Sequence, residues 1–481
     1  MKNNIADDFA LLEELAYRAD VNEQWVDRSL EWLSIEWNQI LADNLYNYLL
    51  LKQDGNFFLP NEPFVLPSRQ EQINGNIDLG TVLGKDELRF KINEDNFDQH
   101  ILISGRSGTG KSNLIKKLAE GALESDVCSV KIFDPKKEYQ DVAMKHRDIL
   151  FLDWRDLKIQ ILKPPPAVPI DSWIMMMATH LAQTYDFLVG ATEMILRMMN
   201  TVIECKKNPC ISDLLNLQDF NEYKSSYKDN LILSTVLSRL RLMKYSFGEV
   251  VDSGFDVMPS LMENNFILQT SGLGGETEGY LMEYILIWCF MHRLYNPEAR
   301  NRMSLFIADE AQHRLFNANK EINRRKISSS IITMLVDQAR EMNIALVSAT
   351  QEPSSLIGAL INNSFVKIAF HHGSGVETKV MKEAMSLNQE QTEALQYLRT
   401  GEAIVRMPGR FMDAFPVKID VFKEHPCMND AEFWQHQKEM KERLYRDSGV
   451  VEGGKASEKT RVGGNDPEDD QNSDWETYDV L

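Results

Sequence analysis

Apolar residues in this chain follow two alternating patterns: short continuous runs and longer segments with helical spacing. A strand covered on both faces carries apolar side chains at nearly every position, so the runs predict buried strands. They lie at His100–Ser104, Val127–Asp134, Ile149–Leu152, Asn265–Gln269, Leu305–Ala308, Ile344–Ser348 and Val366–Phe370. The segments between them place apolar residues three or four positions apart, which predicts helices. This alternation predicts an α/β fold with a mainly parallel sheet.

Changes in the pattern divide the chain. Residues 5–52 have helical spacing, and alternating segments around 77–83 and 88–92 predict a β-hairpin. Residues 403–405 and 415–419 predict a second hairpin that closes the sheet. The expected organisation is a helical N-terminal region with linker at 1–72, a hairpin lead-in at 73–97, a core at 98–170 and 251–425, a helical insertion at 171–250, a C-terminal helix at 426–448 and a disordered acidic tail at 449–481.

Composition limits the class of protein. The best apolar run, Tyr284–Met291, is too short to span a bilayer and is flanked by charged residues, so it predicts a core helix and no membrane insertion. The acidic N-terminus resembles no export signal, and five cysteines form no CxxC pair, which favours a reducing cytoplasm. Nine acidic residues of the tail contribute to the net charge of −20, which neither requires nor excludes DNA as a partner.

One glycine-rich segment carries the clearest chemistry. Residues 105–112 fill the phosphate-loop pattern GxxxxGK[ST], between a predicted strand and a predicted helix. Such a loop directs backbone N–H groups at phosphates. The residues expected to bind the nucleotide are Gly105, Arg106, Ser107, Gly108, Thr109, Gly110, Lys111, Ser112 and Asn113. Lys111 is expected to reach the β- and γ-phosphates of ATP, and the Ser112 hydroxyl to bind Mg²⁺.

Two carboxylates follow the predicted strand at 303–308. The ligand site of a parallel sheet lies at the carboxyl ends of its strands, so Asp309 and Glu310 are expected beside the phosphate loop. Asp309 is expected to hold Mg²⁺, and Glu310 to orient or deprotonate the attacking water. Asp134 and Glu138 follow another strand, where capping of a turn and a direct catalytic role are equally compatible with the sequence. His100 is expected to be a satisfied core histidine.

Further segments resemble the HerA/FtsK superfamily, in particular HerA-like ATPases and the cores of conjugative coupling proteins. They are Ile132–Tyr139 (IFDPKKEY), Asp309–His313 (DEAQH), Gln338–Arg340, Thr350–Ser354 (TQEPS) and Gly401–Ala403 (GEA). The resemblance covers roughly residues 98–420. It implies a RecA-like P-loop NTPase fold and an ATP hydrolase that uses Mg²⁺.

The resemblance assigns two further roles. Gln351 corresponds to the family's sensor, whose amide contacts the γ-phosphate or the attacking water. Arg340 corresponds to an arginine supplied to the nucleotide of the neighbouring subunit, and Arg406 and Arg410 are alternatives. A guanidinium in that position stabilises the charge of the transferring phosphoryl group. From the residues alone, Arg340 also fits a helix C-terminus that satisfies the macrodipole.

The most basic stretch follows the carboxylate pair. It contains Arg314, Lys320, Arg324, Arg325 and Lys326. These side chains suit either contacts with DNA phosphates in the lumen of a ring or a solvated helix face.

The resulting hypothesis is a cytoplasmic, hexameric ATPase that moves double-stranded DNA and works with a nuclease or other effector. Two alternatives remain open: an ATP-gated scaffold that regulates a partner effector, as in phage defence, and a soluble ATPase of a conjugation or secretion apparatus.

Overall fold

A computed structural model of the chain describes most of the sequence between residues 63 and 449. The described residues are 12, 24–35, 42, 45, 63–97, 100–126, 128–187, 190–206, 208–217, 226–311, 315–327, 330–373, 375–424 and 426–449. Helix α2 (Gln24–Ile35) lies in the predicted helical N-terminus, and most of that prediction falls outside the described residues. The predicted disorder of the tail, apart from Gly449, also falls outside them.

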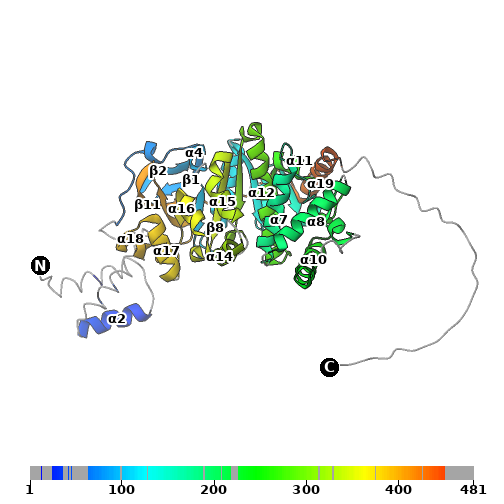
Figure 1. The fold of residues 1–481 in the computed structure, drawn as a ribbon. Helices are drawn as coiled ribbons and strands as arrows, with labels where there is room; N and C mark the ends of the chain where they lie inside the picture. Colours follow the sequence, from blue (N-terminus) through cyan, green and yellow to red (C-terminus); the bar gives the residue numbers. More distant parts are fainter. Residues whose placement is uncertain are drawn as a thin grey trace, which may run out of the picture.

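Eleven strands of the described chain form a single mixed sheet (Figure 1). The strands are β1 (Ile77–Val82), β2 (Lys85–Ile92), β3 (Ile101–Ser104), β4 (Cys128–Asp134), β5 (Ile149–Asp153), β6 (Asn265–Gln269), β7 (Met303–Ala308), β8 (Ile344–Thr350), β9 (Val366–Ala369), β10 (Glu402–Met407) and β11 (Phe411–Ile419). Their order is β2-β1-β11-β10-β9-β3-β8-β7-β4-β6-β5. The stretch from β9 to β5 is parallel throughout, which confirms the predicted α/β fold with a mainly parallel sheet.

The antiparallel part of the sheet consists of two hairpins. Strands β10 and β11 pair as predicted, but they do not close the sheet. Gly80 of β1 pairs with Ile419 of β11, so the β1–β2 hairpin continues the sheet and β2 is its edge strand. The expected lead-in hairpin is therefore part of the sheet itself.

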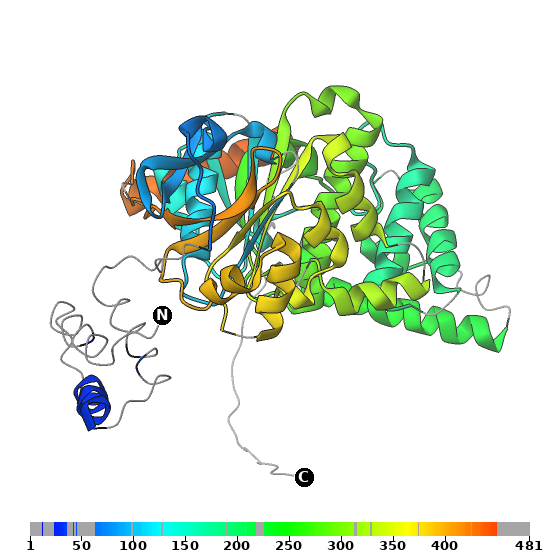
Figure 2. The same ribbon diagram turned by 90° about the vertical axis from the view of Figure 1, so that its left-hand side faces the viewer.

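Helices cover both faces of the sheet. Successive side chains of each central strand point to opposite faces, so each strand contributes to two apolar cores. Ile101 and Ile103 pack in one core with α5 (Lys111–Glu124), α6 (Gln140–Lys145) and α19 (Asp430–Asp447). Leu102 faces the other core. That core includes α7 (Ile170–Thr184), α8 (Ala191–Cys205), α9 (Ile211–Leu215), α10 (Tyr227–Phe247), α12 (Gly275–Tyr295) and α15 (Ile331–Gln338). Figure 2 shows this green-to-yellow layer against one side of the sheet, so the helices of residues 171–250 share the core of the sheet.

Helix α12 contains the apolar run expected to form a core helix, and that expectation is correct. Every residue from Glu278 to Met291 is buried, as in a helix surrounded by protein on all sides. Within the described residues, no helix is long and apolar enough to cross a membrane.

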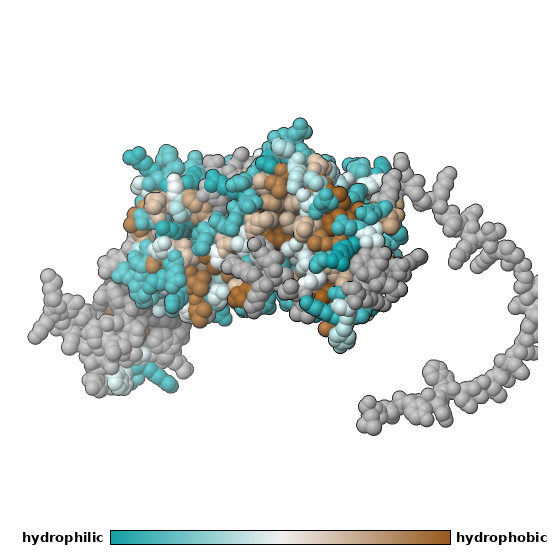
Figure 3. Space-filling view, viewed as in Figure 1, coloured by the Kyte–Doolittle hydropathy of each residue, from teal (hydrophilic) through white to brown (hydrophobic). Residues whose placement is uncertain are grey.

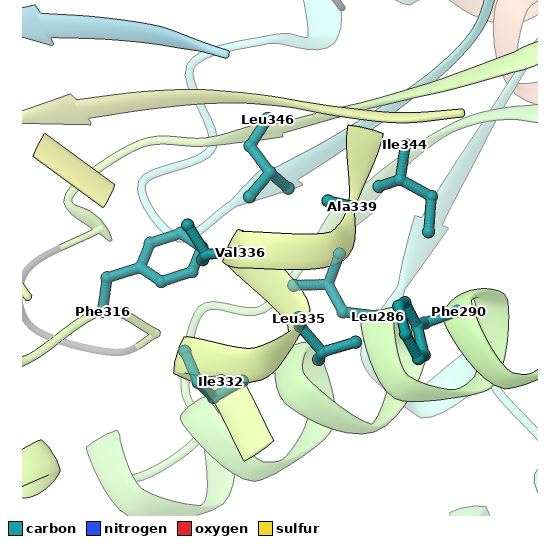
Figure 4. Close-up of a pocket in the computed structure, with 9 residues that line it drawn as sticks. All are labelled: Leu286, Phe290, Phe316, Ile332, Leu335, Val336, Ala339, Ile344 and Leu346. Atoms are coloured by element: carbon teal, nitrogen blue, oxygen red, sulfur yellow. The ribbon is translucent and has the colours of Figure 1, made fainter. Parts of the chain in front are cut away.

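A small cavity of about 10 Å³ marks where α12, α15 and β8 meet (Figure 4). Its lining is apolar throughout, and Phe316, from the segment after β7, reaches toward Val336 of α15. The space is close to that of one water and offers it no polar partner. This packing holds the chain that leads from α15 into β8.

Helix α5 packs unusually closely on β1 at Gly121. A Cβ added there would lie 2.4 Å from Cγ2 of the buried Ile77. We therefore expect Gly121→Ala to lower the free energy of unfolding by about 1–3 kcal/mol through overpacking, although alanine normally stabilises a helix relative to glycine. Gly275→Ala, at the start of α12, is the control because its Cβ would meet nothing within 4 Å. Equal urea-unfolding free energies of the two variants would contradict this packing.

Candidate nucleotide-binding site

Three strand ends converge at one edge of the sheet. Strand β8 lies between β3 and β7, and Ser104 pairs with Thr350 while Ala308 pairs with Ser348. The segments that leave these strands are the phosphate loop, the loop with Gln351 and the loop with the two carboxylates. The strand order therefore brings together three segments that lie far apart in the sequence.

The phosphate loop requires glycine at two positions where the chain passes other backbone. Gly105 has φ 151°, and a Cβ there would lie 2.6 Å from Cβ of Phe370. Gly110 has φ 117° and would place a Cβ 3.3 Å from Cα of Gly401. The Gly401 N–H donates to the carbonyl of Thr109 at 2.8 Å. The GEA turn before β10 is thus packed against the phosphate loop and hydrogen-bonded to it.

Lys111 lies at the start of α5 and is buried. Its Nζ donates to the carbonyls of Gly105 at 2.7 Å and Arg106 at 2.9 Å. Burial lowers the pKa of Lys111, and the charges of Asp309 and Glu310 oppose that shift. The amine is therefore held at the mouth of the loop, near two carboxylates.

The other loop residues divide by exposure. Arg106, Ser107 and Gly108 are exposed, whereas Thr109 is buried and its hydroxyl donates to the Arg106 carbonyl at 2.8 Å. The Asn113 amide instead holds the segment after β11: it donates to the Asp420 carbonyl at 2.9 Å and accepts from the Phe422 N–H at 2.8 Å.

Asp309 and Glu310 are both buried at the end of β7. The Asp309 carboxylate accepts hydrogen bonds from the Tyr139 hydroxyl at 3.1 Å and the Glu310 N–H at 2.9 Å. Burial raises the pKa of Asp309, and the charge of Lys136 opposes the rise. Glu310 has φ 52°, an uncommon conformation for a residue with a side chain. The Glu310 side chain thereby meets partners from two other loops.

Those partners are Lys136 and Gln351. Lys136 Nζ lies 2.5 Å from Oε1 of Glu310, and the Gln351 amide donates to the same oxygen. Burial lowers the pKa of Lys136, but the hydrogen bond to Glu310 and the charge of Asp309 outweigh it, so that pKa is raised. Gln351, predicted as the sensor, is thus in direct contact with Glu310, predicted to act on water.

The contacts in the turn after β4 favour one of the two roles that the sequence allows for Asp134, which are capping of the turn and direct catalysis. The carboxylate is fully buried and accepts the N–H groups of Glu138 at 3.0 Å and Tyr139 at 3.3 Å. Burial raises the pKa of Asp134, and these backbone donors oppose the rise. Asp134 therefore caps the turn. Glu138, in contrast, points at the phosphate loop and accepts from the Ser112 hydroxyl at 2.7 Å.

The three arginines considered for a neighbouring subunit's nucleotide lie at the opposite end of the sheet. Arg340 is exposed in the short helix Arg340–Met342 before β8. The length of β8, seven residues at about 3.3 Å each, separates it from Gln351. Arg406 donates to the Met385 carbonyl and Arg410 to Asn96, so both guanidinium groups have structural partners. The guanidinium of Arg340 makes no hydrogen bond or ion pair with the described residues, and only its backbone carbonyl accepts, from the Asn343 N–H at 3.0 Å.

The basic stretch forms helix α14 (Ala318–Ile327) at the phosphate edge. Lys320 is half-buried, and the buried Glu321 accepts from the hydroxyls of Ser330 at 2.5 Å and Thr333 at 2.6 Å. Arg314 lies outside the described residues, as do the side chains of residues 324–326.

Two histidines, at the two ends of β3, are neutral structural groups. His100 accepts from the Leu346 N–H at 3.2 Å and its Nε2 lies 3.3 Å from the Val336 carbonyl, as expected for a satisfied core histidine. Burial lowers the pKa of His100 to about 4. The ring of His372 contacts the Ser104 hydroxyl at 3.1 Å, and burial lowers its pKa to about 4 as well.

Sequence reasoning assigned no role to Lys136 or Tyr139. Both belong to the IFDPKKEY segment, so the signal was present in the resemblance. What was missing is the pairing of β4 with β7, which brings this turn to the carboxylates.

Comparisons with known proteins agree with this geometry. The family profile described as "Helicase HerA, central domain" matches residues 77–352. The "DNA double-strand break repair helicase HerA" of Saccharolobus solfataricus is 22% identical over 429 residues, 82% of this chain and 80% of the relative.

Solved structures share the fold. VirB4 of Thermoanaerobacter pseudethanolicus has a TM-score of 0.56 at 16% identity, over 73% of this chain and 97% of that one. The plasmid coupling protein TrwB in complex with ADP and Mg²⁺ has a TM-score of 0.56 at 14% identity, over 76% and 95%.

The structural role of Asp134 is testable. An amide can accept at only one of its two positions, so Asp134→Asn leaves one buried N–H unsatisfied and is expected to cost about 1–3 kcal/mol of unfolding free energy. Asp141→Asn, which removes a partly exposed ion pair with Lys116, is the control and is expected to cost about 1 kcal/mol or less. Retained stability of Asp134→Asn with lost ATP hydrolysis would instead give Asp134 a catalytic role.

Proposed function

Because the chain belongs to the family of HerA helicase central domains, we propose that it is the ATP-hydrolysing subunit of a ring that moves double-stranded DNA. The observation that carries this proposal is the contact of Glu310 and Gln351 beside Lys111. A phosphate loop alone binds nucleotide, whereas a buried carboxylate next to a sensor amide suits hydrolysis coupled to movement.

Each group has a chemical task at this site. Backbone N–H groups of residues 105–112 and the Lys111 amine bind the phosphates. Glu310 accepts a proton from, or orients, the water that attacks the γ-phosphate. Gln351 contacts Glu310, and the proposed task of its amide is to contact the γ-phosphate as well, so that its position would depend on the nucleotide bound. A phosphoryl transfer of this kind depends mostly on positioning and charge stabilisation.

The oxygen donors at the site fit Mg²⁺, which prefers carboxylate and hydroxyl oxygens together with those of phosphates. The Ser112 hydroxyl and the Asp309 carboxylate would hold it, and Glu138 already accepts from the Ser112 hydroxyl. When bound, the ion neutralises charge on the β- and γ-phosphates. TrwB, which shares the fold, is described in complex with ADP and Mg²⁺.

A ring is proposed because Arg340 and the phosphate loop lie at opposite ends of the sheet. An arginine that is more than about 20 Å from its own nucleotide can stabilise the transferring phosphoryl group only across a subunit boundary. Figure 3 shows apolar surface among the hydrophilic areas of this face. Exposed apolar residues include Ile170 and Met175 of α7 and Leu294 and Tyr295 of α12. Exposed apolar surface of this kind suits contacts between subunits. We propose a hexamer.

Double-stranded DNA is the proposed substrate of the motor. The relative from Saccharolobus solfataricus is described as a DNA repair helicase and TrwB as a plasmid coupling protein. Helix α14 begins near the phosphate edge, where a change at the nucleotide can move it. Its basic side chains, with Arg314 before it, are the proposed contacts with DNA phosphates. A cytoplasmic location and an effector such as a nuclease, docked on residues 1–72, complete the proposal.

The alternative of an ATP-gated scaffold predicts the same site chemistry without movement along DNA. A soluble ATPase of a conjugation or secretion apparatus is the third candidate, and likeness to VirB4 and TrwB in fold is compatible with it. Co-purification with a membrane channel would favour that candidate.

Displacement of a triplex-forming oligonucleotide from linear duplex DNA tests the motor. With ATP the wild-type protein is expected to displace the third strand. Glu310→Gln is expected to bind ATP without hydrolysing or displacing, because the amide cannot take a proton from water. Lys111→Ala is expected to lose nucleotide binding. Rapid hydrolysis without displacement would favour the scaffold, and normal turnover by Glu310→Gln would remove Glu310 from its role.

The arginine is tested by mixing subunits. Arg340→Ala is expected to keep nucleotide binding and to lose hydrolysis by about 10³-fold or more. Adding Lys111→Ala subunits should restore part of the activity, because they offer an intact Arg340 to an intact phosphate loop. Arg197→Ala, an exposed arginine of α8, is the control and should remain active. Mixtures that regain nothing would contradict action across subunits.

A further inference from the structure

Lys136 brings a second ammonium group to the phosphate site, and neither the phosphate loop nor the carboxylate motif contains it. Its Nζ lies 2.5 Å from Oε1 of Glu310. The Lys136 side chain is 38% exposed, whereas that of Glu310 is 4% exposed. Lys136 can therefore move into the solvent-facing part of the site, while Glu310 is held by its surroundings.

Two donors share one oxygen of Glu310. Lys136 and Gln351 each donate to Oε1, and the φ of 52° turns the residue toward their loops. An oxygen that already accepts hydrogen bonds from an ammonium and an amide has no lone pair left to accept one from water. The described structure therefore holds Glu310 in an arrangement that has to change before this oxygen can act on water.

A nucleotide supplies a competing partner for the ammonium. Lys111 and Lys136 are both close enough to Asp309 and Glu310 to interact with their charges, and they repel one another, so they face the same space. The terminal phosphate of a bound triphosphate carries more negative charge than one carboxylate. It would attract Lys136 away from Glu310, so Oε1 would lose one of its donors and could accept a hydrogen bond from the water instead.

We propose that Lys136 is a positioning residue that holds Glu310 inactive until a triphosphate enters, and then moves to its terminal phosphate. This inference rests on the proposed ATP hydrolysis and adds to it a coupling between nucleotide entry and release of the base. The inference also gives a role to the turn after β4, which belongs to no phosphate loop. Asp134 holds this turn beside the site by accepting the N–H groups of Glu138 and Tyr139.

The chain contains a matched control at the next position. Lys137 is exposed in the same turn, has φ 63° and makes no side-chain hydrogen bond or ion pair with the described residues. Lys136→Met and Lys137→Met remove the same charge from the same turn with the same side chain. Only the first removes the contact with Glu310.

Steady-state ATP hydrolysis without DNA is the first test. Lys136→Met is expected to raise the KM for ATP by about twofold to tenfold, the lower part of the range measured for contacting residues, and not to raise kcat, because saturating ATP has already drawn Lys136 from Glu310 in the wild type. Lys137→Met should match the wild type, and Lys136→Arg should restore a low KM. A Lys136→Met protein that matches Lys137→Met, or whose kcat rises at saturating ATP, would overturn the inference. A wild type that hydrolyses no ATP, with or without DNA, would contradict the proposed function instead.

Nucleotide binding gives a second readout that requires no hydrolysis. With Mg²⁺ chelated, a fluorescent ATP analogue is titrated into the wild type, Glu310→Gln, Lys136→Met and the double variant. Glu310→Gln is expected to tighten binding, and the tightening should be at least about twofold larger when Lys136 is present. If Glu310→Gln tightened binding by the same factor with and without Lys136, as it should with and without Lys137, then Glu310 and the phosphate would not compete for Lys136.

Discussion

The residues Asp309 and Glu310 are both buried, and charges buried to this degree need partners. Tyr139 and Lys136 supply them from the turn after β4, and Gln351 from the loop after β8. Because these turns flank β7 in the sheet, β4 and β8 must lie on either side of it. The same order places β8 next to β3 and its phosphate loop. The need of these two buried carboxylates for partners is therefore met only in a strand order that also places the phosphate loop beside them.

The two ends of the parallel strands have different tasks in the proposed motor. The carboxyl ends carry the phosphate loop, the carboxylates and the start of α14. The amino ends carry Arg340, which is exposed, and Arg406 and Arg410, which hold neighbouring backbone and side chains. Ala339, Met342 and Ile344, which flank Arg340, are buried, and Ala339 and Ile344 line a small apolar cavity together with residues of α12. An exposed arginine on a firmly packed segment suits insertion into the nucleotide site of a neighbour.

The sequence predicted the central strands because each is a continuous apolar run, and it predicted the phosphate loop and Asp309–Glu310 because they directly follow such runs. It did not predict that β1 pairs with β11, since alternation shows that a strand is half-buried but not which strand it joins. The contact of Lys136 with Glu310 was missed for a similar reason: it joins residues 174 positions apart. The capping role of Asp134 was one of two alternatives until the buried N–H donors were seen. The contact of the Asn113 amide with the segment after β11 was likewise not predicted, because the phosphate-loop pattern carries no information on what packs beside it.

The central claim is that ATP hydrolysis at this site drives an assembled ring along DNA. The most direct test is the ATPase rate with and without linear duplex DNA, on protein whose mass in solution is measured in the same buffer. The account predicts a hexamer whose hydrolysis is strongly stimulated by duplex DNA. A hexamer that hydrolyses ATP at the same rate with and without DNA would contradict it and would favour the scaffold.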